Sequence, residues 1–483
     1  MILKWLFKKE NFIESLFVVV CFSLAEKAVG IVRGIVFARF LGPENYGVFT
    51  MAFFFITLII SFSMLGIPSC YGRYVPQYEK KKMLRDFFWK THSFAILTCG
   101  ILFIPCVLFA EHLSRLIYKS SDYKNIIILS SIVILPLALY SNFYSSFTGL
   151  RNFKMSSLMQ FVQIFIFSVM GAVLVIVLTT VESAMIAYLT SVITVTIIFG
   201  YLFWKYAFSH KDQSIKIDED NFYGKILKFS IWFVLTPVVF ELLRYTDRLM
   251  LNYFMGLKEV GVYSVATNVT QIVFMFGMMT ANVLLPNVGK AWENQEKIKT
   301  MMILNLSTKM VIFLLLGCSV VIVLFKKQII LVLYGNNYIE TLPIISMLLV
   351  FWLFNCIVWI IGMYPGLIEK THLQMYAALP GLVLNIVLNY ILIPAYGLIG
   401  AAIATSVSYG MILIILLLLL IKHKLIIDIR TVFICVSTLI LLFDEIFMLT
   451  GFIILAFLFV LSDVIINKEE KQLLTQQIRK VFG

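Results

Sequence analysis

Residues 26–52 read EKAVGIVRGIVFARFLGPENYGVFTMA. Glu26, Lys27 and Arg33 lie inside an apolar segment that is long enough to cross a bilayer, and the turn LGPENYG separates this segment from the next apolar run. A charge at that depth costs roughly 2.5–3.5 kcal/mol on insertion scales, so it normally faces a watery cavity or a partner. The stretch therefore predicts a membrane helix whose charges face water or each other.

The composition is that of a polytopic membrane protein. Of the 483 residues, 61% are hydrophobic and 13% are charged, whereas soluble domains are about half apolar and about a quarter charged. The apolar runs are continuous, which favours helices over the alternating strands of a membrane barrel. The net charge of +13 fits cytoplasmic loops better than a nucleic-acid surface. The seven cysteines have no metal-binding spacing, so we expect no metal, and we expect the five histidines at the membrane interfaces.

The predicted fold is an all-α polytopic membrane protein with about fourteen transmembrane helices, because that many segments stay apolar for roughly 20 residues. The segments lie at about 12–40, 46–69, 89–110, 125–147, 156–179, 183–204, 226–255, 261–287, 302–325, 341–365, 373–394, 397–421, 430–447 and 450–466. None of the connections between them is long enough to form a soluble domain.

Positive charge predicts the topology. Lys and Arg number 27 on one side of the predicted helices and 6 in the loops on the other side. Because cytoplasmic loops carry the excess of positive charge, both termini are predicted to be cytoplasmic. Lys309, just inside the ninth helix, is expected to extend to the cytoplasmic edge.

The two halves of the chain are related by an internal repeat. LGPENYGVFTMA at 41–52 aligns with MGLKEVGVYSVA at 255–266, which pairs Gly42 with Gly256 and Gly47 with Gly261. Six helices separate the copies, so we predict two parallel six-helix lobes related by a pseudo-twofold axis along the membrane normal. The predicted division is an N-lobe at 1–207, a cytoplasmic linker at 208–225, a C-lobe at 226–421, and two further helices with a cytoplasmic tail at 422–483.

Ionisable residues gather on the first and seventh predicted helices, and transporters place their substrate sites at the interface of such repeats. Guanidinium groups suit a phosphate because their planar fork matches two phosphate oxygens. The candidate binding residues for an anionic head group are Lys27, Arg33, Arg244 and Arg248. The candidates for charge partners or for ion coupling are Glu26, Glu241 and Asp247. The alternative is that these groups form salt bridges that hold helix one to helix seven, and the sequence leaves both interpretations open.

Four further side chains are candidates to line a path for sugars. They are Asn355 and Trp359 in the tenth predicted helix and Asn385 and Asn389 in the eleventh. Polar contacts between helices explain these residues about as well.

Three motifs carry a resemblance to a known family. LGPENYG (41–47), GRYVPQYEKKK (72–82) and LNIVLNYILIPAYGLIGAAIATSVSYG (384–410) resemble the polysaccharide-transporter branch of the MOP flippase superfamily, and the likeness covers nearly the whole chain. The resemblance implies an O-antigen translocase (Wzx-like) that moves undecaprenyl-diphosphate-linked oligosaccharides from the cytoplasmic to the outer leaflet of the bacterial inner membrane by alternating access. It implies the diphosphate as the ligand of Arg33, Arg244 and Arg248.

The resemblance also implies what accompanies this transport. We expect no catalytic activity and no cofactor, with H+ or Na+ as a possible coupling ion. The expected partners are membrane lipids, a polysaccharide polymerase and a chain-length regulator, and we expect the protein to act as a monomer. The alternative is an ion-coupled multidrug or small-metabolite exporter of the same superfamily, which the two additional helices disfavour.

Overall fold

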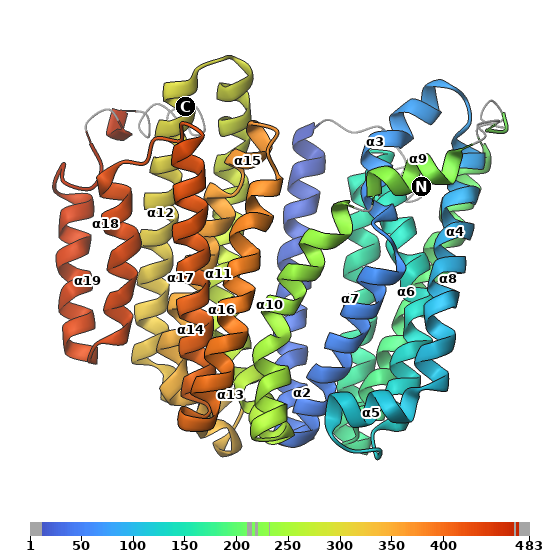
Figure 1. The fold of residues 1–483 in the computed structure, drawn as a ribbon, viewed down its shortest axis with the longest axis horizontal. Helices are drawn as coiled ribbons and strands as arrows, with labels where there is room; N and C mark the ends of the chain where they lie inside the picture. Colours follow the sequence, from blue (N-terminus) through green and yellow to red (C-terminus); the bar gives the residue numbers. More distant parts are fainter. Residues whose placement is uncertain (1–11, 210–214, 218–220, 231, 468–469, 473–483) are drawn as a thin grey trace. The chain divides into compact units, whose positions relative to one another are not determined.

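The protein folds into helices joined by short turns (Figure 1). The computed structural model describes residues 12–209, 215–217, 221–230, 232–467 and 470–472. Among them, ten helices are long and apolar enough to cross a membrane, and the first of these, Val18–Ser63, covers both of the first two predicted helices. Two shorter apolar helices end the series. The total of fourteen remains a prediction, and the predicted cytoplasmic start, part of the linker and most of the tail lie outside the described residues.

The chain divides into two compact units. Unit 1 consists of Met1–Tyr245 and Gly256–Gly261, and unit 2 consists of Thr246–Met255 and Val262–Gly483. The helix α10 (Trp232–Phe254) therefore contributes to both units. The lobe boundaries at the linker 208–225 remain a prediction.

Unit 1 is built around α6, which contacts α2, α3, α4, α5, α7 and α8. Its helices are α2 (Phe12–Ser63), α3 (Ile67–Lys80), α4 (Leu84–Leu108), α5 (Ala110–Tyr118), α6 (Lys124–Gly149), α7 (Phe153–Leu178), α8 (Val181–Ser209) and α9 (Phe222–Ser230), followed by the first part of α10 (Figure 1). The helix α7 packs along α2, and this contact positions the charged groups of α2.

The predicted turn after the first helix is present as a break within α2. Gly42 has a φ of 75° and a ψ of 170°, and its counterpart in the repeat, Gly256, has a φ of 128°. Such positive φ values are unstrained for glycine and costly for other residues, which explains why both copies of the turn carry glycine. The second predicted helix, in contrast, ends at Ser63 and not near residue 69, because Leu65 and Gly66 adopt positive φ before α3 begins.

The second pair of repeat glycines is explained by close backbone packing inside unit 1. A Cβ atom at Gly47 would lie 2.0 Å from the carbonyl oxygen of Leu257, and one at Gly261 would lie 1.8 Å from that of Pro43. Real side chains do not approach backbone atoms so closely, so each position requires glycine. The repeat motif thus contains one glycine for the turn and one for the contact.

The described part of the predicted linker is tied to α4. The backbone N–H of Ile217 donates to Oδ2 of Asp86 over 2.9 Å, and Nζ of Lys90 donates to the carbonyl oxygen of Ile217 over 2.9 Å. The N–H of Ile215 also donates to the carbonyl oxygen of Lys82. These residues of the linker therefore belong to unit 1.

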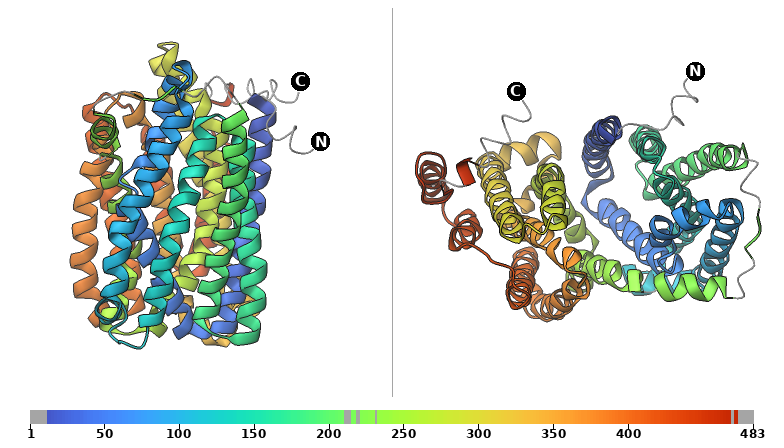
Figure 2. Two further views of the ribbon diagram at one scale, coloured as in Figure 1. Left: turned by 90° about the vertical axis from the view of Figure 1, so that its right-hand side faces the viewer. Right: turned by 90° about the horizontal axis from the view of Figure 1, so that it is seen from above.

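Unit 2 ends in a pair of short helices that pack along α12 (Figure 2). Its elements, after the end of α10, are α11 (Leu257–Glu293), α12 (Lys297–Leu324), α13 (Lys326–Leu333), η1 (Asn336–Ile344), α14 (Ile345–Ile361), α15 (Tyr364–Leu367), α16 (His372–Tyr396), α17 (Leu398–Lys422), α18 (Ile429–Ser437), η2 (Thr438–Leu442) and α19 (Glu445–Val460). The last two predicted helices, 430–447 and 450–466, correspond to α18 with η2 and to α19, with the turn between them several residues earlier than expected.

Lys309 pairs with segments that the sequence predicts to be cytoplasmic, and its side chain is fully buried there. Its position at the cytoplasmic edge stays a prediction. Nζ lies 3.2 Å from Oδ2 of Asp428, before α18, and 2.7 Å from Oε1 of Glu470, after α19. Because unpaired charge is costly in an apolar interior, two carboxylates from outside α12 satisfy this ammonium group and link both ends of the C-terminal helix pair to α12.

His92 is buried in the protein, and its predicted position at a membrane interface stays a prediction. Its side chain in α4 is surrounded by aromatic rings, with the Phe143 ring centroid 4.7 Å from its own. Nδ1 lies 2.7 Å from the carbonyl oxygen of Phe88. The residue is part of the core of unit 1.

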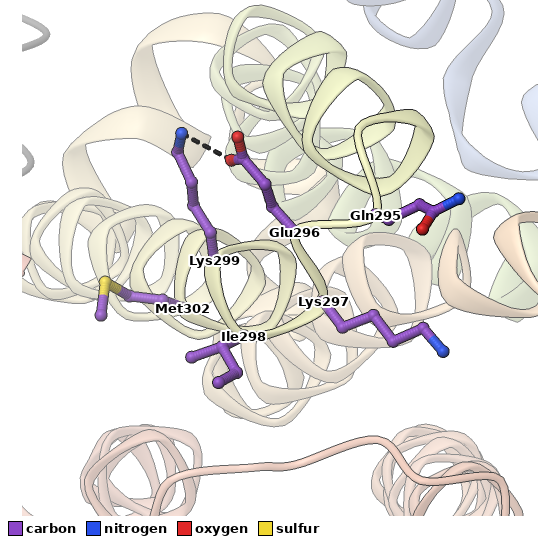
Figure 3. A pocket seen from close by; sticks show the side chains of 6 residues that line it. All are labelled: Gln295, Glu296, Lys297, Ile298, Lys299 and Met302. Carbon is purple, nitrogen blue, oxygen red and sulfur yellow. Dashed lines mark ion pairs between the residues drawn. The ribbon is translucent and has the colours of Figure 1, made fainter.

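A surface hollow lies at the turn between α11 and α12 (Figure 3). It is lined by Gln295, Glu296, Lys297, Ile298, Lys299 and Met302. Lys299 pairs with Glu296 over 2.7 Å, and the Ile298 side chain between the two lysines is 80% exposed. All six residues belong to a single turn, so the hollow is a local feature of that turn.

The close packing at Gly47 and Gly261 yields a prediction. We expect Gly47→Ala or Gly261→Ala to destabilise the protein or to prevent its accumulation, because the new methyl group would overlap a backbone carbonyl. Gly30→Ala is the matched control, since its Cβ would meet nothing within 4 Å and a glycine-to-alanine change within a helix stabilises by roughly 0.5–1 kcal/mol. Thermal unfolding of the purified variants measures the difference. Equal melting temperatures for all three would contradict the close approach.

Candidate functional site

The charged residues of α2 lie against α7. Oε1 of Glu26 is 3.7 Å from Nζ of Lys27 and accepts a hydrogen bond from Nε2 of Gln160 over 3.2 Å. Glu26 is buried, whereas the Lys27 side chain is 49% exposed. One acidic and one basic group of the candidate site thus partly neutralise each other within the same helix.

Arg33 lies two helical turns further along α2 and is not neutralised in this way. Its guanidinium carbon lies 4.3 Å from the ring centroid of Phe167 in α7. In the part of the chain that the structure describes, Arg33 forms no ion pair with a carboxylate. A cation over an aromatic face keeps its charge available to an incoming anion. Arg33 is therefore the cation of α2 that is best suited to an anionic ligand.

The first pair of candidates on α10 is a partly exposed ion pair in unit 1. Nη1 of Arg244 is 3.3 Å from Oε1 of Glu241, three residues earlier, and the Arg244 side chain is 57% exposed. The other carboxylate oxygen of Glu241, Oε2, is buried and has no hydrogen-bond partner among the described residues. A pair whose basic partner is more than half exposed contributes about 0–1 kcal/mol to stability.

Asp247 lies at the centre of a buried polar cluster in unit 2. Its Oδ1 accepts hydrogen bonds from Asn385 over 3.1 Å and from Asn389 over 2.7 Å, both in α16. Its Oδ2 accepts from the hydroxyl groups of Tyr263, over 2.8 Å, and Thr405. We call Asp247 and these four donors the Asp247 cluster. The carboxylate is 2% exposed, and it forms no ion pair with a cation among the described residues.

Arg248, the next residue of α10, is also buried but makes different contacts. Its Nε donates to Oγ of Ser264 over 3.0 Å, and its guanidinium carbon lies 6.0 Å from the ring centroid of Tyr263. The side chain is 6% exposed. Arg248 is therefore positioned by α11, within the same unit as the Asp247 cluster.

The four predicted lining residues fall into two groups. Asn385 and Asn389 are fully buried and turn their amides towards Asp247. Asn355 and Trp359 are half-buried on α14. The role of all four in a path for sugars remains a prediction.

Sequence reasoning missed the neutral partners of the charged residues. Tyr263 lies in the second copy of the repeat, and Thr405 lies in the family motif LIGAAIATSVSYG. The sequence analysis named both segments but assigned no role to these two hydroxyl groups. Gln160 and Phe167 lie in α7, where the sequence shows no motif and no unusual charge. Only the packing of α7 along α2 brings these two residues to the site.

The described side chains of this arrangement can bind ligands through charge and hydrogen bonds. No group of three or more His, Cys, Asp or Glu residues that could hold a metal ion occurs among the described residues. Unit 1 presents a guanidinium group over an aromatic ring, and unit 2 presents a buried, hydrogen-bonded carboxylate. Ionisable groups within membrane segments commonly mark substrate or ion pathways.

Comparison with known proteins identifies the family. The family model described as polysaccharide biosynthesis protein matches residues 12–292, more than half of the chain, and the MatE model matches residues 233–391. The chain belongs to the polysaccharide biosynthesis protein family. Its place in the polysaccharide-transporter branch of the MOP flippase superfamily, which the motifs predicted, is thereby confirmed.

Two relatives of this polysaccharide biosynthesis protein have names that refer to surface polysaccharides. One from Shigella flexneri, named "Putative O-antigen transporter", is 21% identical over 77% of this chain and 88% of its own length. "Capsular polysaccharide biosynthesis protein CapF" of Staphylococcus aureus is 27% identical over 46% of this chain and 57% of its own length. The lipid II flippase MurJ in an inward closed conformation shares the fold, with a TM-score of 0.72 and 19% identity over 91% of this chain and 98% of MurJ.

We expect substitutions of Asp247 and of Arg244, both on α10, to lower the free energy of unfolding by different amounts. Asp247→Ala removes the acceptor of four buried donors, and we expect it to lower the free energy of unfolding by at least about 3 kcal/mol, since each buried unsatisfied group costs about 1–3 kcal/mol. Arg244→Gln breaks a partly exposed pair, so we expect a loss below about 1 kcal/mol. Denaturant unfolding in detergent measures both, and similar losses would count against the buried cluster.

Proposed function

We propose that this polysaccharide biosynthesis protein is a flippase for undecaprenyl-diphosphate-linked oligosaccharide repeat units of a surface polysaccharide, such as O-antigen or capsule. It moves these units from the cytoplasmic to the outer leaflet of the inner membrane by alternating access, with both termini in the cytoplasm. The family match, the names of the relatives and the MurJ-like fold support this proposal. No catalytic step is part of it.

The observation that carries the proposal is the environment of Arg33. Its guanidinium group lies over Phe167 and forms no ion pair with a carboxylate in the described structure. The planar fork matches two oxygens of a phosphate, whereas a sugar offers it no charge. Arg33 therefore binds the diphosphate, while the polyprenyl chain stays in the lipid. Lys27, Arg244 and Arg248 are the further proposed contacts of the diphosphate, and Glu26 and Glu241 hold Lys27 and Arg244 in its absence.

We expect Arg33→Gln to lower the rate of flipping at least tenfold, since a hydrogen bond to a charged group contributes about 1.5–3 kcal/mol. Arg33→Lys keeps the charge but loses the fork, so an intermediate rate is expected. The measurement is flipping of a polyprenyl-diphosphate oligosaccharide of defined sugars in proteoliposomes.

The matched control for this experiment is Arg39→Gln, which removes an exposed charge from the same helix six residues later. Wild-type flipping is expected for this control. Unchanged flipping by a correctly folded Arg33→Gln variant would exclude the proposed contact with the diphosphate.

We further propose that the Asp247 cluster binds a monovalent coupling ion, Na+ or H+. The cluster gathers carboxylate, amide and hydroxyl oxygens, which are the ligands of hard cations, and it contains a single negative charge. Oδ1 of Asn389 is buried without a hydrogen-bond partner in the described structure. This oxygen can therefore coordinate an ion without breaking a hydrogen bond. During transport, Asp247 would give up hydrogen bonds from its neutral donors and bind the ion in their place.

Asp247→Asn keeps the shape of the side chain and removes its charge. We expect this variant to lose the dependence of flipping on an imposed ion gradient, and to lose any rise in melting temperature that Na+ gives the wild-type protein. Glu111→Gln, at an exposed carboxylate paired with Arg115, is the control. A response of the wild-type protein to a pH gradient alone identifies the ion as H+, and an unaltered gradient response of Asp247→Asn contradicts the proposal.

A second candidate function is export of small cationic compounds coupled to an ion. The match of residues 233–391 to the MatE model favours it, because these residues include the buried Asp247. Transport of a cationic drug by the purified protein, with no flipping of lipid-linked oligosaccharides, would support this alternative.

A further inference from the structure

Unit 2 contains a groove beside the C-terminal end of α12, which is the end opposite to the α11–α12 turn. It has a volume of about 840 Å3, within the range of roughly 300–1,000 Å3 that is typical of ligand pockets. The groove runs between α17 and the connection from η2 to α19, so we call it the α17–α19 groove. Its lining residues include Lys326, Met347, Ser406, Val407, Phe443 and Glu445.

The walls of the groove suit a hydrocarbon chain. Val407 on α17 is 48% exposed, and Phe443 and Ile446 at the start of α19 are 58% and 79% exposed. In a membrane protein, exposed apolar side chains of this kind contact lipid. Ser406 keeps its hydroxyl group bonded to the carbonyl oxygens of Met347 and Ala402, so it adds no unsatisfied polar group to the wall.

The mouth of the groove is charged. Nζ of Lys326 lies 3.6 Å from Oε1 of Glu445, and Asp444 is the adjacent residue. Asp444 stands at the N-cap position of α19 without making a side-chain capping hydrogen bond. The mouth therefore presents one ammonium group and two carboxylates beside an apolar channel.

This charge pattern distinguishes between classes of lipid. The phosphate of a zwitterionic phospholipid fits Lys326, and its ammonium group fits the two carboxylates, through charge-assisted hydrogen bonds. A polyprenyl diphosphate or an anionic phospholipid such as phosphatidylglycerol has no ammonium group, so it would leave Asp444 and Glu445 facing a further negative charge. We propose that the α17–α19 groove binds phosphatidylethanolamine as a resident lipid of unit 2, separate from any transported substrate.

The test uses the full-length protein, reconstituted in nanodiscs of equal parts phosphatidylethanolamine and phosphatidylglycerol and then released for native mass spectrometry. We expect the wild-type protein to retain one phosphatidylethanolamine. Val407→Trp fills the groove from a partly exposed position and is expected to lower this retention about tenfold, because the indole ring occupies the space of the acyl chain. The matched control is Ile414→Trp, seven residues later on the same face of α17, with a 59% exposed side chain outside the groove.

A second pair of variants tests the mouth without filling the groove. Lys326→Gln is expected to weaken retention, and the double variant Asp444→Asn with Glu445→Gln is expected to remove the preference for phosphatidylethanolamine over phosphatidylglycerol. Equal retention by the Val407→Trp and Ile414→Trp variants would overturn the proposal. So would retention of phosphatidylglycerol, or of a co-purified polyprenyl lipid, in place of phosphatidylethanolamine.

Discussion

A charged side chain inside a bilayer must be solvated by the protein itself, and this constraint explains most of the polar structure described above. The protein meets it in three ways. Neighbouring residues pair, as Glu26 does with Lys27. Neutral donors surround a carboxylate, as they do at Asp247. An aromatic face supports a cation, as Phe167 does under Arg33. The last arrangement leaves the charge available to a ligand, which is why the proposed function depends on it.

The helical architecture could be predicted from the sequence because hydrophobicity alone determines which segments enter a membrane. The turn glycines could be aligned because backbone conformation restricts those positions to one residue type. What the sequence could not reveal was which side chain solvates which charge. Lys309 is the clearest case: its partners, Asp428 and Glu470, lie more than a hundred residues later, so no local pattern pointed to them.

In the candidate site, too, the partners of the charged residues could not be predicted from the sequence. Asp247 was recognised as an ionisable group at depth, but its four donors come from α11, α16 and α17, and only folding brings them together. The sequence interpretation offered either ligand binding or pairing between α2 and α10 for the whole set of charges. The structure adds a separate environment for each residue of α10: Arg244 is exposed beside Glu241, Arg248 contacts Ser264, and Asp247 is surrounded by neutral groups.

The repeated glycine turn also limits how far the two copies of the motif can differ from each other. At Gly42 and Gly256 the backbone excludes other residues through its torsion angle, and at Gly47 and Gly261 through the proximity of another backbone. The crowding backbone belongs to the other copy in each case, and a side-chain substitution there would not remove its carbonyl group. The four positions therefore restrict the chain to glycine through the backbone alone, whatever side chains surround them.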